Sequence, residues 1–367
     1  MSPRRQDARR IQELVAVVDL GSTAVRILLA RVTPAARFQI VAQERVPTRL
    51  GGGAPGTLSR RAIEATLRAV RRFFRRYRRE GAGPRVVAVA TSAVRDARNR
   101  ERLLAPLRER EGIEVQVLSA GAEARLGVAA ALASLPMRNA VVADLGGSSL
   151  QLSRVRRRRV VSTASVPLGS VRTTRRFLHR DPPSARELRA LRDEVRAQLR
   201  TALPLAGRDE VVIGLGGTVR TLASIYLRSH PGERRHRHGL RLDQADVTAI
   251  RERLERVSRR RRQTIRGLRA ERTDIIVAGA VVIEEVLVFG GYRALVVCTR
   301  GVRDGLLLRE TFAGRRNGRG LDGRQRLRES RAVVAGVQPP GAGRGAGPER
   351  PAARTGEVPG HLQLEPR

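Results

Sequence analysis

The chain has 367 residues, of which 73 are Lys or Arg and 35 are Asp or Glu, so its formal net charge is +38. The single cysteine, Cys298, excludes an intrachain disulfide and a cysteine-based zinc cluster, and it agrees with a cytoplasmic location. An aromatic content of 2%, with no Trp, argues against a protein that stacks nucleic acid bases on a single-strand platform. The length is sufficient for two hydrophobic cores, so we expect two domains.

The positive charge has two explanations. No lysine occurs in the chain, so Arg supplies every positive side chain, as a GC-rich genome would favour. Such a bias explains the choice of Arg but not the size of the net charge. Clustered Arg side chains attract polyanions and form bidentate contacts with phosphate oxygens. A partner rich in phosphate is therefore expected.

Short β-branched segments alternate with amphipathic segments along the chain, which predicts an α/β fold. Strands are expected at residues 15–18, 86–90, 115–118, 141–143, 211–213 and 295–298. Helices are expected after the capping residue Ser59, from Ser184 onward, and around Val247 and Ile250. The apolar stretches 11–20 and 275–283 are too short to cross a membrane, so no membrane association is expected.

One local pattern occurs twice: an apolar strand ends in Asp, at Asp19 and again at Asp144, and a turn of small residues follows. The two copies are about one domain apart, which predicts two equivalent halves that present their loops to a shared cleft. Pro136 should end the helix between them. We therefore expect domains at residues 11–136 and 137–312, followed by a disordered Arg-, Gly- and Pro-rich tail at 313–367.

Three glycine-rich loops, at residues 19–26, 144–149 and 214–218, follow predicted strands. Small residues let backbone N–H groups approach phosphate closely. Each loop alone is weak support, because a glycine-rich turn after a strand usually serves only as a tight connection. Three such loops, two of them preceded by Asp, indicate a phosphate site.

At these loops the sequence resembles the exopolyphosphatase and guanosine pentaphosphate phosphohydrolase family, from about residue 15 to residue 308. The matching stretches, which also agree in order and spacing, are 18–26 (VDLGSTAVR), 90–99 (ATSAVRDARN), 119–126 (SAGAEARL), 144–149 (DLGGSS), 167–172 (PLGSVR), 214–218 (GLGGT), 274–280 (DIIVAGA) and 300–308 (RGVRDGLLL). The resemblance implies an actin-like fold with two ribonuclease-H-like domains around a central cleft. It also implies release of orthophosphate from a chain end with Mg²⁺ or Mn²⁺.

The resemblance assigns Glu123 as the general base that activates water. The alternative is an exposed glutamate in the first turn of a helix, where the helix dipole favours negative charge. Arg95 and Arg26 match cationic positions in the cleft that would neutralise charge on the transferred phosphoryl group. Ion pairs with nearby acidic residues are the alternative for both arginines.

The remaining site residues come from the first two loops. The resemblance implies that phosphate oxygens face Gly21, Ser22, Thr23, Gly146, Gly147, Ser148 and Ser149, and that the metal is held by Asp144, Asp19 and the residue at position 151. Position 151 is Gln, a neutral ligand, where the family usually has Glu. Ala122 and Thr23 also replace a usual Glu and Asn. These departures predict weaker metal binding or slower turnover.

Two enzymatic functions and one non-enzymatic function follow. The first is an exopolyphosphatase that releases terminal orthophosphate from inorganic polyphosphate. The second is a guanosine pentaphosphate 5′-phosphohydrolase, which would act in the stringent response. The third is a catalytically weakened protein that binds polyphosphate or nucleotide, and non-specific nucleic acid binding belongs with it. A homodimer is compatible with each of the three.

Overall fold

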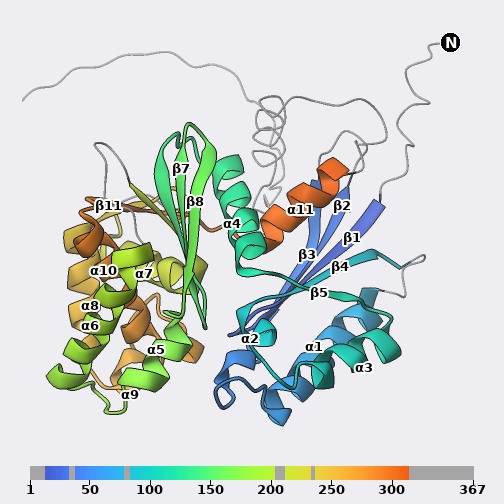
Figure 1. Cartoon of the computed structure of the whole chain (residues 1–367), viewed down its shortest axis with the longest axis horizontal. Coiled ribbons are helices and arrows are strands. Elements are labelled where there is room, and N and C mark those ends of the chain that lie inside the picture. Colours follow the sequence, from blue (N-terminus) through green and yellow to red (C-terminus); the bar gives the residue numbers. More distant parts are fainter. Residues whose placement is uncertain (1–12, 33–37, 78–82, 203–210, 233–235, 314–367) are drawn as a thin grey trace, which may run out of the picture. The chain divides into compact units, whose positions relative to one another are not determined.

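The computed structural model describes residues 13–32, 38–77, 83–202, 211–232 and 236–313, and these contain two β-sheets (Figure 1). The first sheet has the strand order β3-β2-β1-β4-β5. Its strands are β1 (Glu13–Leu20), β2 (Val25–Val32), β3 (Phe38–Val46), β4 (Arg85–Ala90) and β5 (Val115–Val117). The helical segments among and after these strands are η3 (Leu50–Gly52), α1 (Arg60–Tyr77), α2 (Ser92–Arg95), α3 (Glu101–Glu111) and α4 (Ala120–Ser134).

The second sheet has the strand order β10-β11-β9-β6-β7-β8. Its strands are β6 (Ala140–Leu145), β7 (Leu150–Arg156), β8 (Arg159–Val166), β9 (Val212–Leu215), β10 (Arg241–Asp243) and β11 (Ala294–Val297). The helical segments that follow in the chain are α5 (Ser170–Phe177), α6 (Ala185–Ala202), α7 (Gly216–Ser229), α8 (Gln244–Glu255), α9 (Arg259–Arg262), η5 (Ala270–Arg272), α10 (Ile276–Gly290) and α11 (Val302–Ala313).

The two sheets share one topology. In the first, β1 pairs antiparallel with β2, β2 antiparallel with β3, and β4 and β5 continue parallel to β1. In the second, β6, β7 and β8 repeat the antiparallel set, and β9 and β11 continue parallel to β6. The predicted α/β, actin-like fold is confirmed. Its consequence is that Asp19 and Asp144 occupy equivalent positions near the ends of the two central strands.

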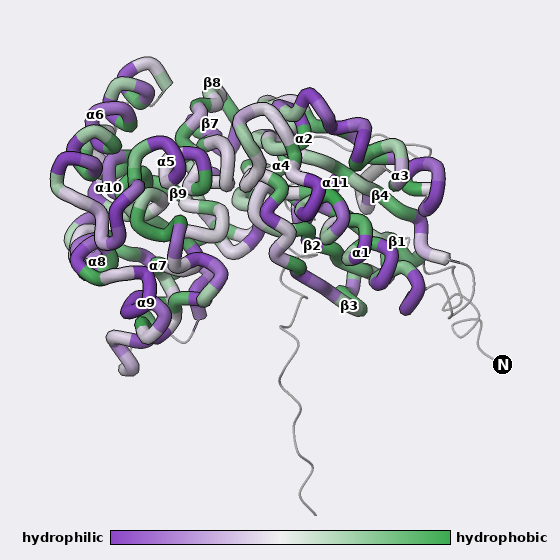
Figure 2. Tube along the Cα trace, turned by 90° about the horizontal axis from the view of Figure 1, so that it is seen from below, coloured by the Kyte–Doolittle hydropathy of each residue, from purple (hydrophilic) through white to green (hydrophobic). Residues whose placement is uncertain are grey.

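Hydrophobic side chains concentrate in the strands and in α10, and polar side chains in the outer helices (Figure 2). In α1, Ile63, Val70 and Phe74 are buried, as predicted from their helical spacing, while most of the arginines between them are exposed. Helix α10 is buried over nearly its whole length, including Glu284 and Glu285. No helix in the described part of the chain is long and apolar enough to cross a membrane.

The last described helix returns to the first sheet. Leu306, Leu307 and Leu308 of α11 share a hydrophobic cluster with Val15 and Val17 of β1, and α11 also packs on α4. The predicted end of α4 before Pro136 is confirmed, since Ser134 is its last residue. The domain division at residues 136 and 137 stays a prediction, and the predicted tail lies beyond the described residues apart from residue 313.

A buried ionic cluster joins three helices of the second sheet's layer. Arg251 of α8 donates two hydrogen bonds of 2.9 Å to Glu284 and one of 2.6 Å to Glu255. Arg196 of α6 makes a bidentate contact with Glu285, at 2.8 and 3.1 Å. Because each buried charge has a partner, the cluster is tolerated within an apolar layer.

Glu284→Gln tests this cluster. It leaves the guanidinium of Arg251 with one partner fewer, so the free energy of unfolding should fall by about 3–5 kcal/mol. Chemical denaturation followed by circular dichroism measures the change. Glu109→Gln is the control, because that side chain is 64% exposed and its ion pair with Arg108, at 3.8 Å, should contribute less than about 1 kcal/mol. Equal effects of the two substitutions would contradict this interpretation.

Candidate active site

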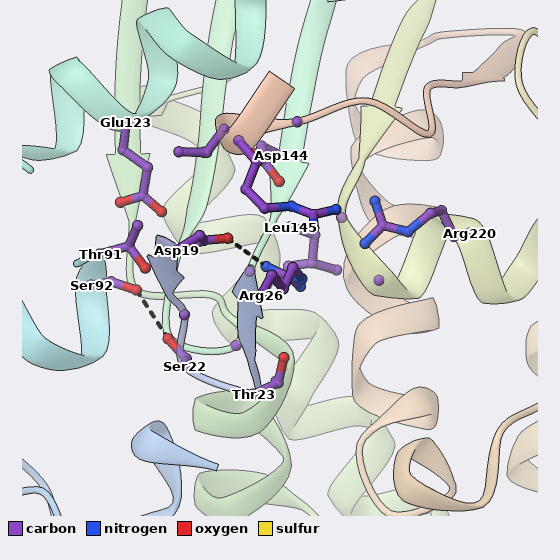
Figure 3. Close-up of a pocket in the computed structure, with 18 of the residues that line it drawn as sticks. Asp19, Ser22, Thr23, Arg26, Thr91, Ser92, Glu123, Asp144, Leu145 and Arg220 are labelled. Atoms are coloured by element: carbon purple, nitrogen blue, oxygen red, sulfur yellow. Dashed lines mark hydrogen bonds and ion pairs between the residues drawn. The ribbon is translucent and has the colours of Figure 1, made fainter. Parts of the chain in front are cut away.

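A pocket lies where the loops after the central strands of both sheets meet, and Figure 3 shows its wall. Its volume is about 80 Å³, several times the roughly 15 Å³ that one water molecule needs. Most of its lining comes from the loops after β1, β6 and β9 and from the segment that opens α11, and Thr91, Ser92, Glu123 and Arg272 complete it. The three predicted glycine-rich loops therefore share one pocket, as the sequence analysis expected.

The third loop supplies a helix N-terminus. Helix α7 begins at Gly216, directly after β9, and both Gly216 and Gly217 line the pocket. Gly216 has φ +96°, a conformation that favours glycine. A Cβ atom on Gly217 would overlap the guanidinium of Arg272. Glycine is thus required at Gly216, a side chain at Gly217 would displace Arg272, and the free N–H groups of the first helical turn favour an anion here.

Serine side chains connect the first two loops. The Ser148 hydroxyl donates to Ser22 Oγ at 3.0 Å, and Ser22 Oγ lies 3.3 Å from Ser92 Oγ (Figure 3). The predicted phosphate residues that line the pocket are Gly21, Ser22, Thr23, Arg26, Gly146 and Gly147. Ser148 and Ser149 are buried behind this lining. The structure therefore brings most of the predicted phosphate residues together in the pocket wall. Ser148 and Ser149 lie behind the wall, where Ser148 contacts Ser22.

Glu123 lies in the first turn of α4 and is 7% exposed, so its interpretation as an exposed glutamate is wrong. Burial raises the pKa of the Glu123 carboxyl to about 7, and the charges of Asp144 and Asp19 act in the same direction. The hydrogen bond from Arg95 opposes this shift. A carboxyl with a pKa near neutrality can take a proton from water at neutral pH, which is the property that a general base needs.

Arg95 contacts the Glu123 carboxylate from outside the pocket lining. Its guanidinium Nη1 donates to Glu123 Oε2 at 3.0 Å and to the carbonyl oxygen of Leu118 at 2.8 Å. Arg95 is not among the residues that line the pocket. The ion pair that was the alternative to a role in the cleft is therefore present, and in this structure Arg95 orients the Glu123 carboxylate.

Arg26 also has the ion pair that was its alternative. Its Nη1 lies 3.0 Å from Asp19 Oδ2 (Figure 3). Unlike Arg95, it lines the pocket, and its Nε is buried with no hydrogen-bond partner among the described residues. Arg26 can thus keep its ion pair with Asp19 and also donate to a phosphoryl group in the pocket, because the pair uses only part of its hydrogen-bonding capacity.

Three further arginines in the pocket wall were not predicted: Arg220, Arg272 and Arg303. Within the described residues none of them has a carboxylate within 4 Å. Burial, together with the charges of neighbouring arginines, lowers the pKa of Arg220 to about 10 and that of Arg272 to about 9. All three remain charged at neutral pH. Two of them lie in or beside motifs of the sequence, since Arg220 follows the third loop by two residues and Arg303 lies within RGVRDG, whereas Arg272 lies in none.

The predicted metal ligands are only partly together. Asp19 and Asp144 both line the pocket, and burial raises the pKa of Asp144. Gln151 lies opposite Asp144 on β7, is 2% exposed, and donates from its amide to Ser149 Oγ at 2.8 Å. The part of the chain that the structure describes has no group of three or more His, Cys, Asp or Glu side chains that could hold a metal ion.

The two sheets of actin-like topology meet at one pocket, which is lined by glycine-rich loops and by arginines without a carboxylate partner. These features are those of an enzyme that handles phosphate groups. The chain belongs to the Ppx/GppA phosphatase family, whose model matches residues 28–312. It is therefore a phosphatase, a hydrolase that acts on phosphoanhydride bonds, and the family predicted from the sequence is confirmed.

Individual relatives agree with this assignment. The chain is 31% identical to Exopolyphosphatase 2 of Mycobacterium tuberculosis over 312 residues, which cover 80% of this chain and 97% of the relative. It is 30% identical to Exopolyphosphatase 1 of Mycobacterium bovis, over 80% of this chain and 87% of the relative. A crystal structure of the Ppx/GppA family member from Aquifex aeolicus is similar with a TM-score of 0.71 and 26% identity, over 84% of this chain and 100% of that chain.

The environment of Glu123 predicts the pH dependence of activity. A base must be deprotonated, so phosphate release should rise with pH through about 7. Arg95→Gln removes the hydrogen bond and charge that lower the pKa of Glu123, so the rise should move to higher pH. Rates measured from pH 5 to pH 9 test both statements. A shift of the variant's profile to lower pH would contradict the proposed contact.

Proposed function

We propose that this protein is an exopolyphosphatase, which releases terminal orthophosphate from inorganic polyphosphate. The observation that carries the proposal is the pocket, where a buried carboxyl with a pKa of about 7 shares one wall with arginines that have no carboxylate partner. A terminal phosphoryl group provides the negatively charged partner that these arginines lack. The names of the two mycobacterial relatives support polyphosphate as the substrate.

In the proposed reaction, Glu123 accepts a proton from the attacking water, and Arg95 holds its carboxylate in place. Arg26, Arg220 and Arg272 stabilise the negative charge of the transferred phosphoryl group. The N-terminus of α7 and the loop with Gly146 and Gly147 add backbone donors.

We propose Mg²⁺ or Mn²⁺ as cofactor, held by Asp144 and Asp19. Two carboxylates in one pocket fit Mg²⁺, which proteins usually bind with one or two carboxylates and substrate phosphates. The ion would supply charge neutralisation at the phosphoryl oxygens. Gln151 would join this set only if its amide oxygen reached the pocket, because Gln151 is not among the residues that line it.

Guanosine pentaphosphate is the second candidate substrate, because its 5′ end presents the same terminal phosphoryl group. Phosphate release from polyphosphate and from guanosine pentaphosphate, measured side by side with Mg²⁺ or Mn²⁺, distinguishes the two. We expect faster release from polyphosphate. Faster release from guanosine pentaphosphate would assign the protein to the second reaction. Release from neither substrate would favour the third function, a protein that binds polyphosphate or nucleotide without hydrolysing it.

Glu123→Gln provides the residue-level test of the proposed base. The amide keeps the shape of the side chain and loses its basicity, so the rate should fall by about 100- to 10,000-fold. Equilibrium binding of polyphosphate should persist. Glu64→Gln is a matched control, because Glu64 lies on the outer surface of α1 and, among the described residues, pairs only with Arg60 and Arg68. A Glu123→Gln rate similar to that of the control would remove Glu123 from its proposed role.

A further inference from the structure

A line of arginines leads from the pocket to the surface along the contact between β3 and the η5 segment. Arg272 in the pocket wall is 6% exposed. The side chain of Arg45, on β3, is 24% exposed, and that of Arg269, just before η5, is 61% exposed. This increase in exposure gives the line a direction, from inside the pocket to solvent.

The guanidinium groups of Arg45 and Arg269 are close in space, because they lie 2.9 and 4.0 Å from the same oxygen, Glu271 Oε1. Burial lowers the pKa of Arg45, and the charges of Arg26 and Arg269 lower it further. Arg45 in turn contributes to the lowered pKa of Arg272. Arg26 and Arg45 face each other across β2 and β3. The positive charge is thus continuous from the pocket to Arg269.

One carboxylate lies between the two outer arginines. Arg45 Nη1 is 2.9 Å from Glu271 Oε1, and Arg269 Nη1 is 4.0 Å from the same oxygen. The Glu271 side chain is 29% exposed, so solvent and solutes can reach it. A phosphate group offers the same acceptors with more negative charge, and Arg binds phosphate oxygens bidentately.

A separate contact holds this region in place. Arg49 donates to Asp274 Oδ1 at 3.2 Å and to the carbonyl oxygen of Glu271 at 3.0 Å. The η5 segment is therefore fixed beside the first sheet without the help of Glu271's own carboxylate. Arg45 and Arg269 can therefore exchange that carboxylate for an anionic ligand without loss of the contact that fixes η5.

We propose that Arg45 and Arg269 bind phosphates of a linear polyphosphate beyond the terminal one, and that the chain displaces Glu271 as their counter-ion. The inference rests on the proposed function and adds a preference for chain length. A long chain has further phosphates for Arg45 and Arg269 to bind, whereas tripolyphosphate and the 5′ triphosphate of a nucleotide end after three phosphates. The protein therefore favours long polyphosphate.

The test compares KM for long-chain polyphosphate with KM for tripolyphosphate in the full-length protein. Arg269→Gln should raise the ratio of the two roughly two- to fivefold, the range of one exposed ion pair. Glu271→Gln removes the competing carboxylate and should lower the ratio by a similar factor. Arg253→Gln is the matched control: it removes one exposed positive charge from α8, which contributes no residue to the pocket, and should leave the ratio unchanged.

Binding provides a readout that does not depend on turnover. In a Glu123→Gln background, the Kd for long polyphosphate should increase with Arg269→Gln and decrease with Glu271→Gln, and its salt dependence should become shallower in the former. Equal ratios for Arg269→Gln and Arg253→Gln would overturn the inference while leaving the exopolyphosphatase intact. Absence of phosphate release from any polyphosphate by the unchanged protein would instead overturn the proposed function.

Discussion

The central constraint in this protein is positive charge enclosed in the pocket wall without a carboxylate partner. Arg272 is 6% exposed, and one of its terminal nitrogens has no hydrogen-bond partner within the described ranges. A buried charge that lacks a partner costs several kcal/mol. The fold accepts this cost at the place where three loops and a helix N-terminus converge. In the proposed function, the phosphate group of the substrate supplies the missing negative partner.

The rest of the architecture serves to assemble that site. Repetition of one topology brings Asp19 and Asp144 to equivalent strand ends, and the serine contacts between Ser22, Ser92 and Ser148 join the loops. Behind the wall, Arg95 fixes the Glu123 carboxylate. Burial, which lowers the pKa of Arg220 and Arg272, also raises the pKa of the Glu123 carboxyl to about 7. The electrostatic environment thus prepares the pocket both for a phosphate group and for proton transfer.

Sequence reasoning predicted the parts of the fold that depend on local pattern. Strands β1, β4, β6, β9 and β11 follow β-branched runs, and α1 and α6 have clear helical spacing. It did not predict β2 and β3, since the buried run in β2 has no alternation, and β3 becomes a strand only by pairing with β2. That pairing also places Arg45 opposite Arg26.

The site residues that lie in recognisable sequence motifs could be predicted. Glu123, Asp19 and the three glycine-rich loops were identified from such motifs, and all contribute to the pocket. Arg272 was missed because nothing in its local sequence distinguishes it from the other arginines of this chain; its role comes from packing over Gly217. The orientation of Gln151 toward Ser149 likewise depends on a side-chain contact that residue type does not determine.

Thermal unfolding of Arg272→Met, with and without tripolyphosphate, tests the central claim most directly. Methionine keeps an apolar stem of similar length and removes the charge. Without ligand the variant should melt at the same temperature as the unchanged protein or higher, because an unpaired buried charge is gone. The increase in melting temperature on adding tripolyphosphate should be largely lost, since ligand binding stabilises only through its affinity for the folded state. An undiminished ligand-induced increase would contradict the account.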